Sequence, residues 1–368
     1  MRIDALELEQ FRNYEAERFS FDESCNVIFG ENAQGKTNLL EAIIYLSTGK
    51  SPRARADKEM IRFGAPACKL RAGVFSRERE FALETVLQQG RQKKVTVNGV
   101  SVKKGGAQSS GILHTVYFCP EDLFLIREGA AARRKFMDTA LCQLRPRYAE
   151  ALFKYNRAYE SKTRILRDSE EHPALLQALP EFDHQMALYG AAVIHYRAQF
   201  VQRLAEYAAV NHAECSGGKE TLSLSYTTVK TVSDPFAPQE TLFEQLREHQ
   251  AEHARAELAS RLCLSGPHKD DIEVCIDGIS AKAYSSQGQT RTAALSMKLA
   301  EREIYKNVIG EYPVLLLDDV LSELDPRRQE FVLNRIGGGQ VFITCCEDDR
   351  LEELLNGKVF HIQNGTSL

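Results

Sequence analysis

The chain has 368 residues, of which 43% are hydrophobic and 27% are charged, and its formal net charge is −4. This length predicts about two domains, and the composition is typical of a globular protein. We find no apolar run near the ~20 residues that a membrane-spanning helix needs, and the charged N-terminus does not resemble a signal peptide. Nine scattered cysteines without a C-x-x-C pair indicate reduced thiols, a cytoplasmic protein and no structural zinc.

The first hundred residues mostly carry strand patterns. Ile3–Leu8 indicates an N-terminal strand, and a turn at 11–14 leads into a second strand that includes Phe19 and Phe21. Further strands are expected at 69–75, 80–87 and 93–102, the last with a hairpin turn at Val97–Val100. Together they predict an antiparallel platform.

Between these strands, Gly30–Asn38 matches the phosphate-binding pattern G-x-x-x-x-G-K-[ST] in full. A buried strand, Cys25–Phe29, is expected before it and a helix after it. The glycines let the backbone approach phosphate oxygens, which the loop N–H groups and the helix N-terminus attract. Lys36 can reach the β- and γ-phosphates, and the Thr37 hydroxyl can bind Mg²⁺. The predicted nucleotide-binding residues are Gly30, Glu31, Asn32, Ala33, Gln34, Gly35, Lys36, Thr37 and Asn38.

Residues 121–260 carry helical patterns. Apolar and aromatic residues recur at three-to-four spacing from Arg147 to Asp168 and, after His172-Pro173, from Phe182 to Tyr207. The second run, about 26 residues long, is expected to be one arm of an antiparallel helical hairpin. A short strand pattern follows, and then another helix from about Gln239 to Cys263.

This helical region contains a basic segment. Arg127–Arg167 holds eleven basic and four acidic residues, a local charge of +7. A DNA backbone responds to such a patch rather than to the net charge. DNA contact and an ordinary solvated helix face are both open interpretations, as they are for the basic loop Gly49–Arg55.

Residues 261–368 return to strand and helix patterns. The apolar strand Val314–Leu317 ends in Asp318-Asp319, and P-loop enzymes hold Mg²⁺ with such an acid. Core strands are also expected at Val341–Thr344 and Val359–Ile362. Because the acidic strand is far along the chain from the P-loop, we expect the nucleotide site to be assembled from both chain ends. Between them, the sequence Y-S-S-Q-G-Q at 284–289 precedes a helix and indicates an anion-binding helix start.

Ser286, Gly288 and Gln289 stand at the characteristic positions of the signature loop in ABC-type ATPases, and Leu324-Asp325 resembles the D-loop of these proteins. More closely, the chain resembles the RecF family of bacterial recombination mediators, which are SMC-like ATPases without long coiled coils. The matching segments are F-R-N-Y (11–14), V-I-F-G-E-N-A-Q-G-K-T-N-L-L-E-A-I (27–43), P-E-D-L (120–123), R-R-K-F-M-D (133–138), G-P-H-K-D-D-I-E-V (266–274), S-Q-G-Q-T-R-T (286–292) and L-L-D-D-V-L-S-E-L-D (316–325).

The resemblance implies an α/β fold: an ABC/SMC-type P-loop ATPase head, with a mixed sheet and a small antiparallel β subdomain, and an inserted α-helical arm. We expect the N-terminal part of the head at residues 1–120, the arm at 121–260 and the C-terminal part of the head at 261–368.

The resemblance also implies how ATP is held. Arg12 and Asn13 would lie near the base or ribose, and Asp318 would join Thr37 at the Mg²⁺ ion. Lys36 and Asp319 would be catalytic. Asp319 stands where most ABC heads have a glutamate that orients the attacking water. Since aspartate is one methylene shorter, slow hydrolysis is expected.

The remaining implied residues act between two copies of the chain. Ser286, Gly288 and Gln289 would meet the γ-phosphate of a partner subunit, and Asp325 would lie at the same interface. ATP would thus join a head-to-tail homodimer. The usual switch histidine is absent, since Thr344-Cys345 stands at that position.

The implied function is an ATP-dependent clamp on duplex DNA and single-strand/duplex junctions. Members of the family act with RecR and RecO to help load RecA at gaps. Three other interpretations stay open: a P-loop kinase with a small acceptor, an SMC-type chromosome-architecture protein, and a passive DNA-binding module with a degenerate ATP site. The signature loop argues against the first, the short arm against the second, and the intact Lys36 and Asp318 against the third.

Overall fold

The computed structural model describes residues 1–102, 111–346 and 357–368, and the chain divides into two compact units. The first unit joins Met1–Leu123 to Lys298–Leu368, and the second is the intervening Phe124–Met297. The first unit is therefore built from both chain ends. These units differ from the expected domain boundaries in two respects, because 261–297 belongs to the second unit rather than to the head, and 121–123 belongs to the first unit rather than to the arm.

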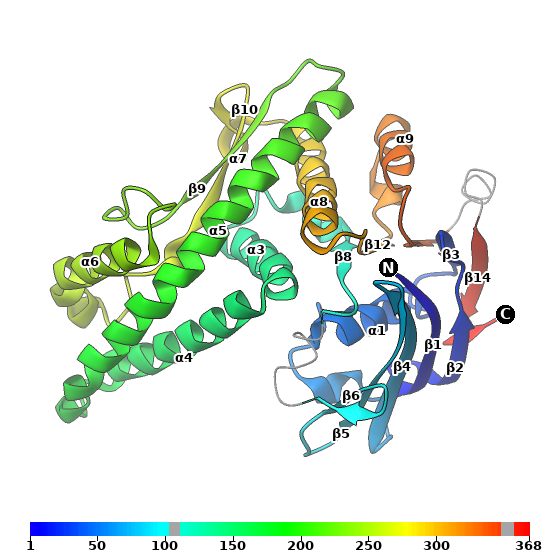
Figure 1. The fold of residues 1–368 in the computed structure, drawn as a ribbon, viewed down its shortest axis with the longest axis horizontal. Helices are drawn as coiled ribbons and strands as arrows, with labels where there is room; N and C mark the ends of the chain where they lie inside the picture. The colour runs from blue at the N-terminus through cyan, green and yellow to red at the C-terminus, as the bar shows by residue number, and fades with distance from the viewer. Residues whose placement is uncertain (103–110, 347–356) are drawn as a thin grey trace. The chain divides into compact units, whose positions relative to one another are not determined.

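The first unit contains a six-stranded sheet made of β3 (Cys25–Phe29), β8 (Thr115–Phe118), β12 (Val314–Asp318), β13 (Val341–Cys345), β14 (Lys358–Gln363) and β15 (Thr366–Ser367). The strand order is β15-β14-β3-β13-β12-β8. Of these strands, β14, β3, β12 and β8 are labelled in Figure 1. All neighbours from β14 to β8 are parallel, and β15 is antiparallel. Every residue of β3, β12 and β13 is buried, as in parallel strands covered on both faces. The predicted core strands at Cys25–Phe29, Val314–Leu317, Val341–Thr344 and Val359–Ile362 are confirmed as β3, β12, β13 and β14.

The second sheet of this unit is antiparallel throughout. Its strands are β1 (Arg2–Phe11), β2 (Tyr14–Ser20), β4 (Ala67–Ser76), β5 (Arg79–Gln88), β6 (Lys94–Val97) and β7 (Val100–Ser101), in the order β2-β1-β4-β5-β6-β7. β2 ends at Ser20, so that Phe21 lies just beyond the strand expected to include it. Asn98 and Gly99 have φ values of 49° and 77°, as the Asn-Gly hairpin turn requires.

Helix α1 (Lys36–Thr48) follows the P-loop and packs into the core of this unit. Its residues Leu39 and Ile43 share one apolar cluster with Leu6 of β1 and Phe342 of β13. Nearly every position of α1 is buried, since apolar side chains surround the helix. The unit also contains α9 (Pro326–Arg335) and the 3₁₀ helices η1 (Asp57–Met60), η2 (Pro120–Phe124) and η5 (Leu321–Glu323).

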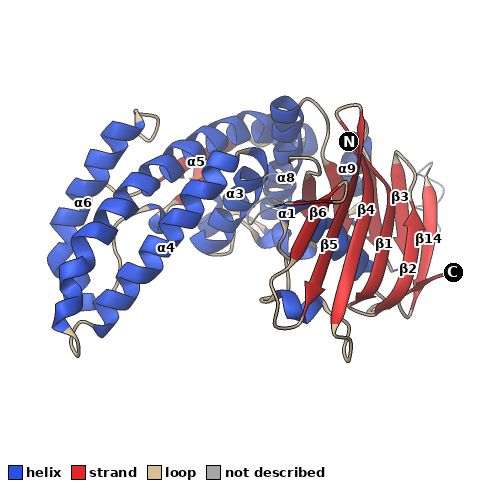
Figure 2. Cartoon of the chain, turned by 60° about the horizontal axis from the view of Figure 1, so that its bottom comes forward, coloured by secondary structure: helices blue, strands red, loops and turns tan. Residues whose placement is uncertain are grey.

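The second unit is mostly helical (Figure 2). It contains α3 (Ala130–Leu144), α4 (Pro146–Asp168), η3 (Pro173–Ala178), α5 (Leu179–Ser216), α6 (Gln239–Ser260), η4 (Pro267–Lys269), α7 (Ala281–Tyr284) and a small sheet of β9 (Leu222–Thr227), β10 (Asp271–Ile276) and β11 (Ile279–Ser280). α5 packs against α4, α6 and β9. Helix α8 (Gln287–Ile309) begins in this unit and ends in the first.

The expected helical hairpin is formed by α4 and α5, but α5 is longer than predicted. It has 38 residues and ends where Gly217 adopts a left-handed φ of 70°. The aromatic pattern from which we predicted its length stops at Tyr207, whereas alanines and other small residues continue the helix. Among the described residues, no helix is both long and apolar enough to cross a bilayer.

Candidate functional site

In the first unit, the motif Gly30–Asn38 connects β3 to α1. A Cβ atom at Gly30 would lie 2.4 Å from the carbonyl oxygen of Ile362, and one at Gly35 would lie 2.7 Å from the side-chain amide of Asn13. Gly35 also has a φ of 123°, which residues with a side chain rarely adopt. Glycine is therefore required at both positions, because neighbouring segments pack directly against the loop.

The residues between the two glycines form the exposed rim of the loop. Glu31, Asn32 and Ala33 are exposed, and Ala33 has a left-handed φ of 65°. The side-chain oxygen of Gln34 accepts a hydrogen bond from the backbone N–H of Asn364 at 2.6 Å. The loop is thereby anchored to the turn between β14 and β15.

Lys36 is 4% exposed, and its ammonium lies against the loop. It donates to the carbonyls of Gly30 and Glu31 at 2.5 and 3.1 Å, and it lies 3.2 Å from the sulfur of Cys346. Within the described part of the chain, it has no ion pair with a carboxylate. Because a buried charge requires a partner, this ammonium is suited to an anionic ligand.

Three hydroxyl groups hold the Asp318 carboxylate at the end of β12. Oδ1 accepts from Thr37 and Thr344, both at 2.9 Å, and Oδ2 accepts from the Tyr117 phenol at 2.7 Å. Tyr117 and Thr344 come from β8 and β13, the strands that flank β12. Burial and the charge of Asp318 raise the pKa of Tyr117, so that its phenol remains a donor. Thr37 and Asp318, predicted as metal ligands from distant parts of the chain, are in direct contact.

Asp319 has a left-handed φ of 52°, and its backbone N–H donates to the Thr344 hydroxyl at 2.9 Å. Burial raises the pKa of its carboxyl and the neighbouring Asp318 charge adds to the effect, against an opposing contribution from Lys36. The sulfur of Cys346 lies 3.8 Å from this carboxylate as well as 3.2 Å from Lys36. The two predicted catalytic side chains therefore share Cys346 as a neighbour.

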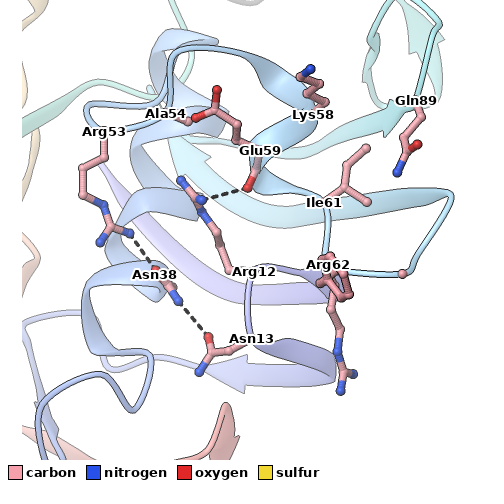
Figure 3. A pocket seen from close by; sticks show the side chains of 12 residues that line it. Arg12, Asn13, Asn38, Arg53, Ala54, Lys58, Glu59, Ile61, Arg62 and Gln89 are labelled. Carbon is pink, nitrogen blue, oxygen red and sulfur yellow. Dashed lines mark hydrogen bonds between the residues drawn. The ribbon is translucent and has the colours of Figure 1, made fainter.

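An open pocket of about 850 Å³ adjoins the loop (Figure 3). Arg12 and Asn13, predicted to lie near the base or ribose, both line it. Asn13 donates to the Gln34 carbonyl at 2.7 Å and accepts from Asn38 at 2.8 Å, so that the pocket wall is bonded to the P-loop. The other lining residues are Asn38, Arg53, Ala54, Lys58, Glu59, Ile61, Arg62, Phe63, Gly64 and Gln89.

One buried carboxylate, Glu41 of α1, holds two arginines of this pocket. Arg12 donates to it through Nε and Nη2, and Arg53 through Nη2, each at 2.8 Å. Burial by itself would raise the pKa of Glu41, but the donors Arg12 and Ser51 and the arginine charges hold it below its ordinary value. The carboxylate therefore stays ionised and specifies where the two guanidinium groups lie.

These features fit a nucleoside triphosphate and Mg²⁺ on chemical grounds. The loop and the Lys36 ammonium suit phosphate oxygens, and the hydroxyl of Thr37 with the carboxylate of Asp318 supplies the oxygen ligands that Mg²⁺ prefers. The described residues contain no cluster of three or more His, Cys, Asp or Glu side chains suited to a metal. Such a small protein ligand set is typical of Mg²⁺ bound together with phosphates and water.

Ser286, Gly288 and Gln289 lie at the start of α8, in the second unit. The Gln289 N–H donates to the Ser286 hydroxyl oxygen at 3.2 Å, and the Ser286 N–H donates to the Gln289 side-chain oxygen at 2.8 Å. This reciprocal pair is a capping box, which sets the first turn of the helix. The start of a long helix attracts anions, as the predicted γ-phosphate contact requires.

Asp325, predicted to lie at an interface between two copies, is the N-cap of α9. Its carboxylate accepts from the Arg328 N–H at 3.1 Å and pairs with the Arg328 guanidinium. It thus starts a helix within the first unit. The interface role stays a prediction.

The basic segment Arg127–Arg167 contains both exposed charges and buried ion pairs. Arg133 binds Asp271 through two bonds of 2.6 and 2.8 Å, and Lys162 lies 2.6 Å from Asp183 and 2.5 Å from Glu257. The patch interpretation is wrong for these two residues, because burial removes them from any DNA surface. The exposed basic residues of the segment are Arg127, Lys135, Arg145, Arg147, Lys154, Arg157, Arg164 and Arg167.

Sequence reasoning missed three residues that hold the site together, Tyr117, Cys346 and Glu41, and it named Thr344 only as the residue at the switch-histidine position. Thr344 lies near the end of β13, the strand next to β12, and Cys346 directly follows β13. Neighbouring parallel strands end at the same edge of a sheet. That rule could have found them. Tyr117 belongs to a strand that we did not predict, and Glu41 is indistinguishable from the solvent-facing residues of other helices until its buried partners are known.

A family model described as the RecF/RecN/SMC N terminal domain matches residues 2–367. The DNA replication and repair protein RecF of Agathobacter rectalis is 41% identical over 369 residues, which cover 99% of this chain and 98% of the relative. The protein of the same name from Lachnospira eligens is 37% identical over 372 residues, with the same coverage.

Solved structures give the same match. The recombination mediator protein RecF of the RecFOR pathway, solved with ATPrS, superposes with a TM-score of 0.92 and 32% identity, covering 100% of this chain and 97% of the other. The structure of the RecF protein with ATP has a TM-score of 0.90 and 33% sequence identity, and the match covers 100% of this chain and 96% of the other. An SMC head bound to the C-winged helix domain of ScpA, at a TM-score of 0.58 and 15% identity, shares the fold.

Proposed function

Because this chain belongs to the RecF family of DNA replication and repair proteins, we propose that it is an ATP-regulated DNA clamp of recombinational repair. Two copies would pair head to tail, each contributing the signature loop to ATP held by the other. One observation carries the proposal: two segments that are suited to anions, and that we infer to act on the same kind of nucleotide site, lie in different compact units. One is the P-loop with Lys36 and Asp318, and the other is the start of α8.

Each group of residues would bind a different part of ATP. The loop N–H groups and Lys36 would bind the phosphates, while Arg12, Asn13 and the adjoining pocket would receive the base and ribose. Thr37 and Asp318 would hold Mg²⁺, which neutralises phosphate charge when bound. Ser286, Gly288 and Gln289 would close over the γ-phosphate from the second copy, with Asp325 nearby.

Hydrolysis of ATP would be slow, and its role would be to release the dimer. Asp319 would orient and deprotonate the attacking water, because a positioned carboxylate can accept a proton from it. Its short side chain places the carboxylate less far into the site than glutamate would. Slow turnover would therefore give the ATP-bound dimer a long lifetime.

DNA would be bound through its backbone. The exposed basic residues of the segment Arg127–Arg167 would contact phosphates, and affinity should fall as salt rises. Backbone contacts carry little sequence information, so a structure such as a single-strand/duplex junction would be recognised. Since one solved relative is described as a mediator in the RecFOR pathway, we infer that RecR and RecO are partners, that RecA loading is the outcome, and that the cytoplasm is the place of action.

The test is the mass of the protein in solution, measured with and without Mg-ATP and with and without a gapped duplex. We expect a monomer without nucleotide, a dimer with Mg-ATP, and a stronger dimer when the gapped duplex is added. A monomer under all four conditions would contradict the clamp and favour the kinase or the passive DNA binder.

A further inference from the structure

In the signature loop, the side chain of Gln289 is held at both ends of its amide. Its oxygen accepts from the Ser286 N–H at 2.8 Å, and its nitrogen donates to the Glu220 carboxylate at 3.0 Å. Ser286, Gln289 and Glu220 all belong to the second unit. Glu220 is far from the loop in sequence and lies in the connection between α5 and β9.

Glu220 is itself held in place by α5 and β10. Its other carboxylate oxygen lies 3.2 Å from Nε2 of His212, which is fully buried on α5. The next residue, Thr221, donates its N–H and its hydroxyl to Asp277 at 2.8 and 2.9 Å. The carboxylate therefore approaches the signature loop from a connection that is fixed on both sides.

The charge of Glu220 determines which way the Gln289 amide points. An ionised carboxylate can only accept hydrogen bonds, so the NH₂ end of the amide must face Glu220. The oxygen end then faces the Ser286 N–H and completes the capping box. Since the Ser286 oxygen accepts from the Gln289 N–H, the serine hydroxyl hydrogen is directed to another acceptor.

We propose that Glu220 is a positioning residue of the signature loop, acting through Gln289. It fixes the geometry in which Ser286 donates to a phosphate, and His212 links that geometry to α5 of the arm. The inference rests on the proposed function, because the phosphate is the γ-phosphate of ATP held by a second copy. Without Glu220 the amide can reverse, which removes the acceptor from the Ser286 N–H.

The experiment measures the dissociation constant of the Mg-ATP-dependent dimer for the wild type and for Glu220→Ala, Glu220→Gln and Glu206→Ala. Glu206 is exposed on α5 and controls for the loss of one negative charge. We expect about tenfold weaker pairing for Glu220→Ala, equivalent to about 1.4 kcal/mol. Glu206→Ala should match the wild type. Glu220→Gln should lie within about threefold of it, because its amide oxygen still accepts from Gln289.

Two further measurements separate positioning from general damage. The affinity of the monomer for Mg-ATP should be the same in Glu220→Ala as in the wild type, since the P-loop lies in the other unit. The double variant Glu220→Ala/Gln289→Ala should weaken pairing no more than Gln289→Ala does alone. The reason is that Glu220 acts only through Gln289, so that its loss has no further effect once Gln289 is gone.

Additive losses in the double variant, or wild-type pairing by Glu220→Ala, would overturn the role of Glu220. A wild-type protein that stays monomeric with Mg-ATP would instead contradict the proposed function, so the two failures are distinguishable.

Discussion

At the residue scale, the phosphate site depends on charges whose partners come from distant parts of the chain. Among the described residues, Lys36 hydrogen-bonds only to carbonyls and a thiol, whereas Asp318 accepts hydrogen bonds from hydroxyl groups of three elements. Lys36 has no ion pair with a carboxylate in the described part of the chain, and Thr37 and Asp318 supply oxygen ligands, so that a phosphate with Mg²⁺ suits both groups. Ser286 belongs to the other compact unit, so we expect Lys36 and Ser286 to have different roles.

Lys36→Ala and Ser286→Arg should therefore fail at different steps. Lys36→Ala removes the cation of the P-loop and should reduce the affinity for ATP at least tenfold. Because pairing depends on bound ATP, dimer formation should be lost as well. Ser286→Arg should bind ATP like the wild type but should not pair, because a long side chain fills the start of α8. Nucleotide titration of each monomer, followed by its mass with Mg-ATP, checks both. Equal loss of ATP binding would contradict a signature loop acting on a second copy.

At the element scale, α1 organises the pocket beside the P-loop. Glu41, a buried carboxylate on this helix, forms ion pairs with Arg12 from the β1–β2 turn and with Arg53 from the loop that follows α1. Breaking a buried ion pair by removing one partner is costly, because the remaining charges are left unpaired. The pocket and the stability of the unit are therefore linked through the ionisation of Glu41.

Glu41→Gln should lower the free energy of unfolding by about 3 kcal/mol at pH 7. The pKa of Glu41 is lowered in the folded state, so its stabilisation is present above its unfolded pKa and is lost as the pH falls through the folded value. The difference between wild type and variant should thus shrink below about pH 4. Urea unfolding of both proteins at several pH values measures it. A difference that stays constant from pH 7 to pH 3 would rule out this ionisation.

The helices of the second unit carry charges with two separate roles. Lys162 and Arg133 join elements to one another, while Arg157 and Arg164 are exposed two turns apart on one face of α4. Residue type alone does not separate these roles, since burial decides which charges a DNA backbone can reach.

The double variant Arg157→Ala/Arg164→Ala should weaken DNA binding and flatten its salt dependence. Each phosphate contact that is lost should lower the slope of log affinity against log salt by about 0.9. Arg247→Ala/Arg255→Ala on α6, an exposed pair with the same change in charge, is the control. Titration of a labelled duplex at several salt concentrations gives the slopes. Equal slopes of log affinity against log salt for the two variants would show that these α4 residues do not contact DNA.

At the scale of the whole molecule, the chain ends form one compact unit and the middle forms another. This division places the P-loop and the signature loop in different units of the same chain. In a symmetric pair of copies, each nucleotide would then be held by the P-loop of one copy and the signature loop of the other.

Mixing the two variants above should restore part of the pairing that each has lost. A mixed dimer combines the intact P-loop of Ser286→Arg with the intact signature loop of Lys36→Ala, so that one of its two sites is complete. We expect dimers with Mg-ATP in the mixture and none in either variant alone, by mass measurement with one variant carrying a tag. No dimer in the mixture would show that both sites must be complete or that the sites are not shared.

The sequence by itself predicted the fold class, the P-loop between a buried strand and a helix, the acidic strand and the family. These features are local or repeat over a few residues, and short-range backbone geometry and apolar patterning specify them. It did not predict that Tyr117 and Thr344 flank Asp318, that Glu41 holds two arginines, or that Arg133 and Lys162 are buried. Strand order and long-range packing decided these contacts, because they bring together residues whose spacing in the chain carries no signal.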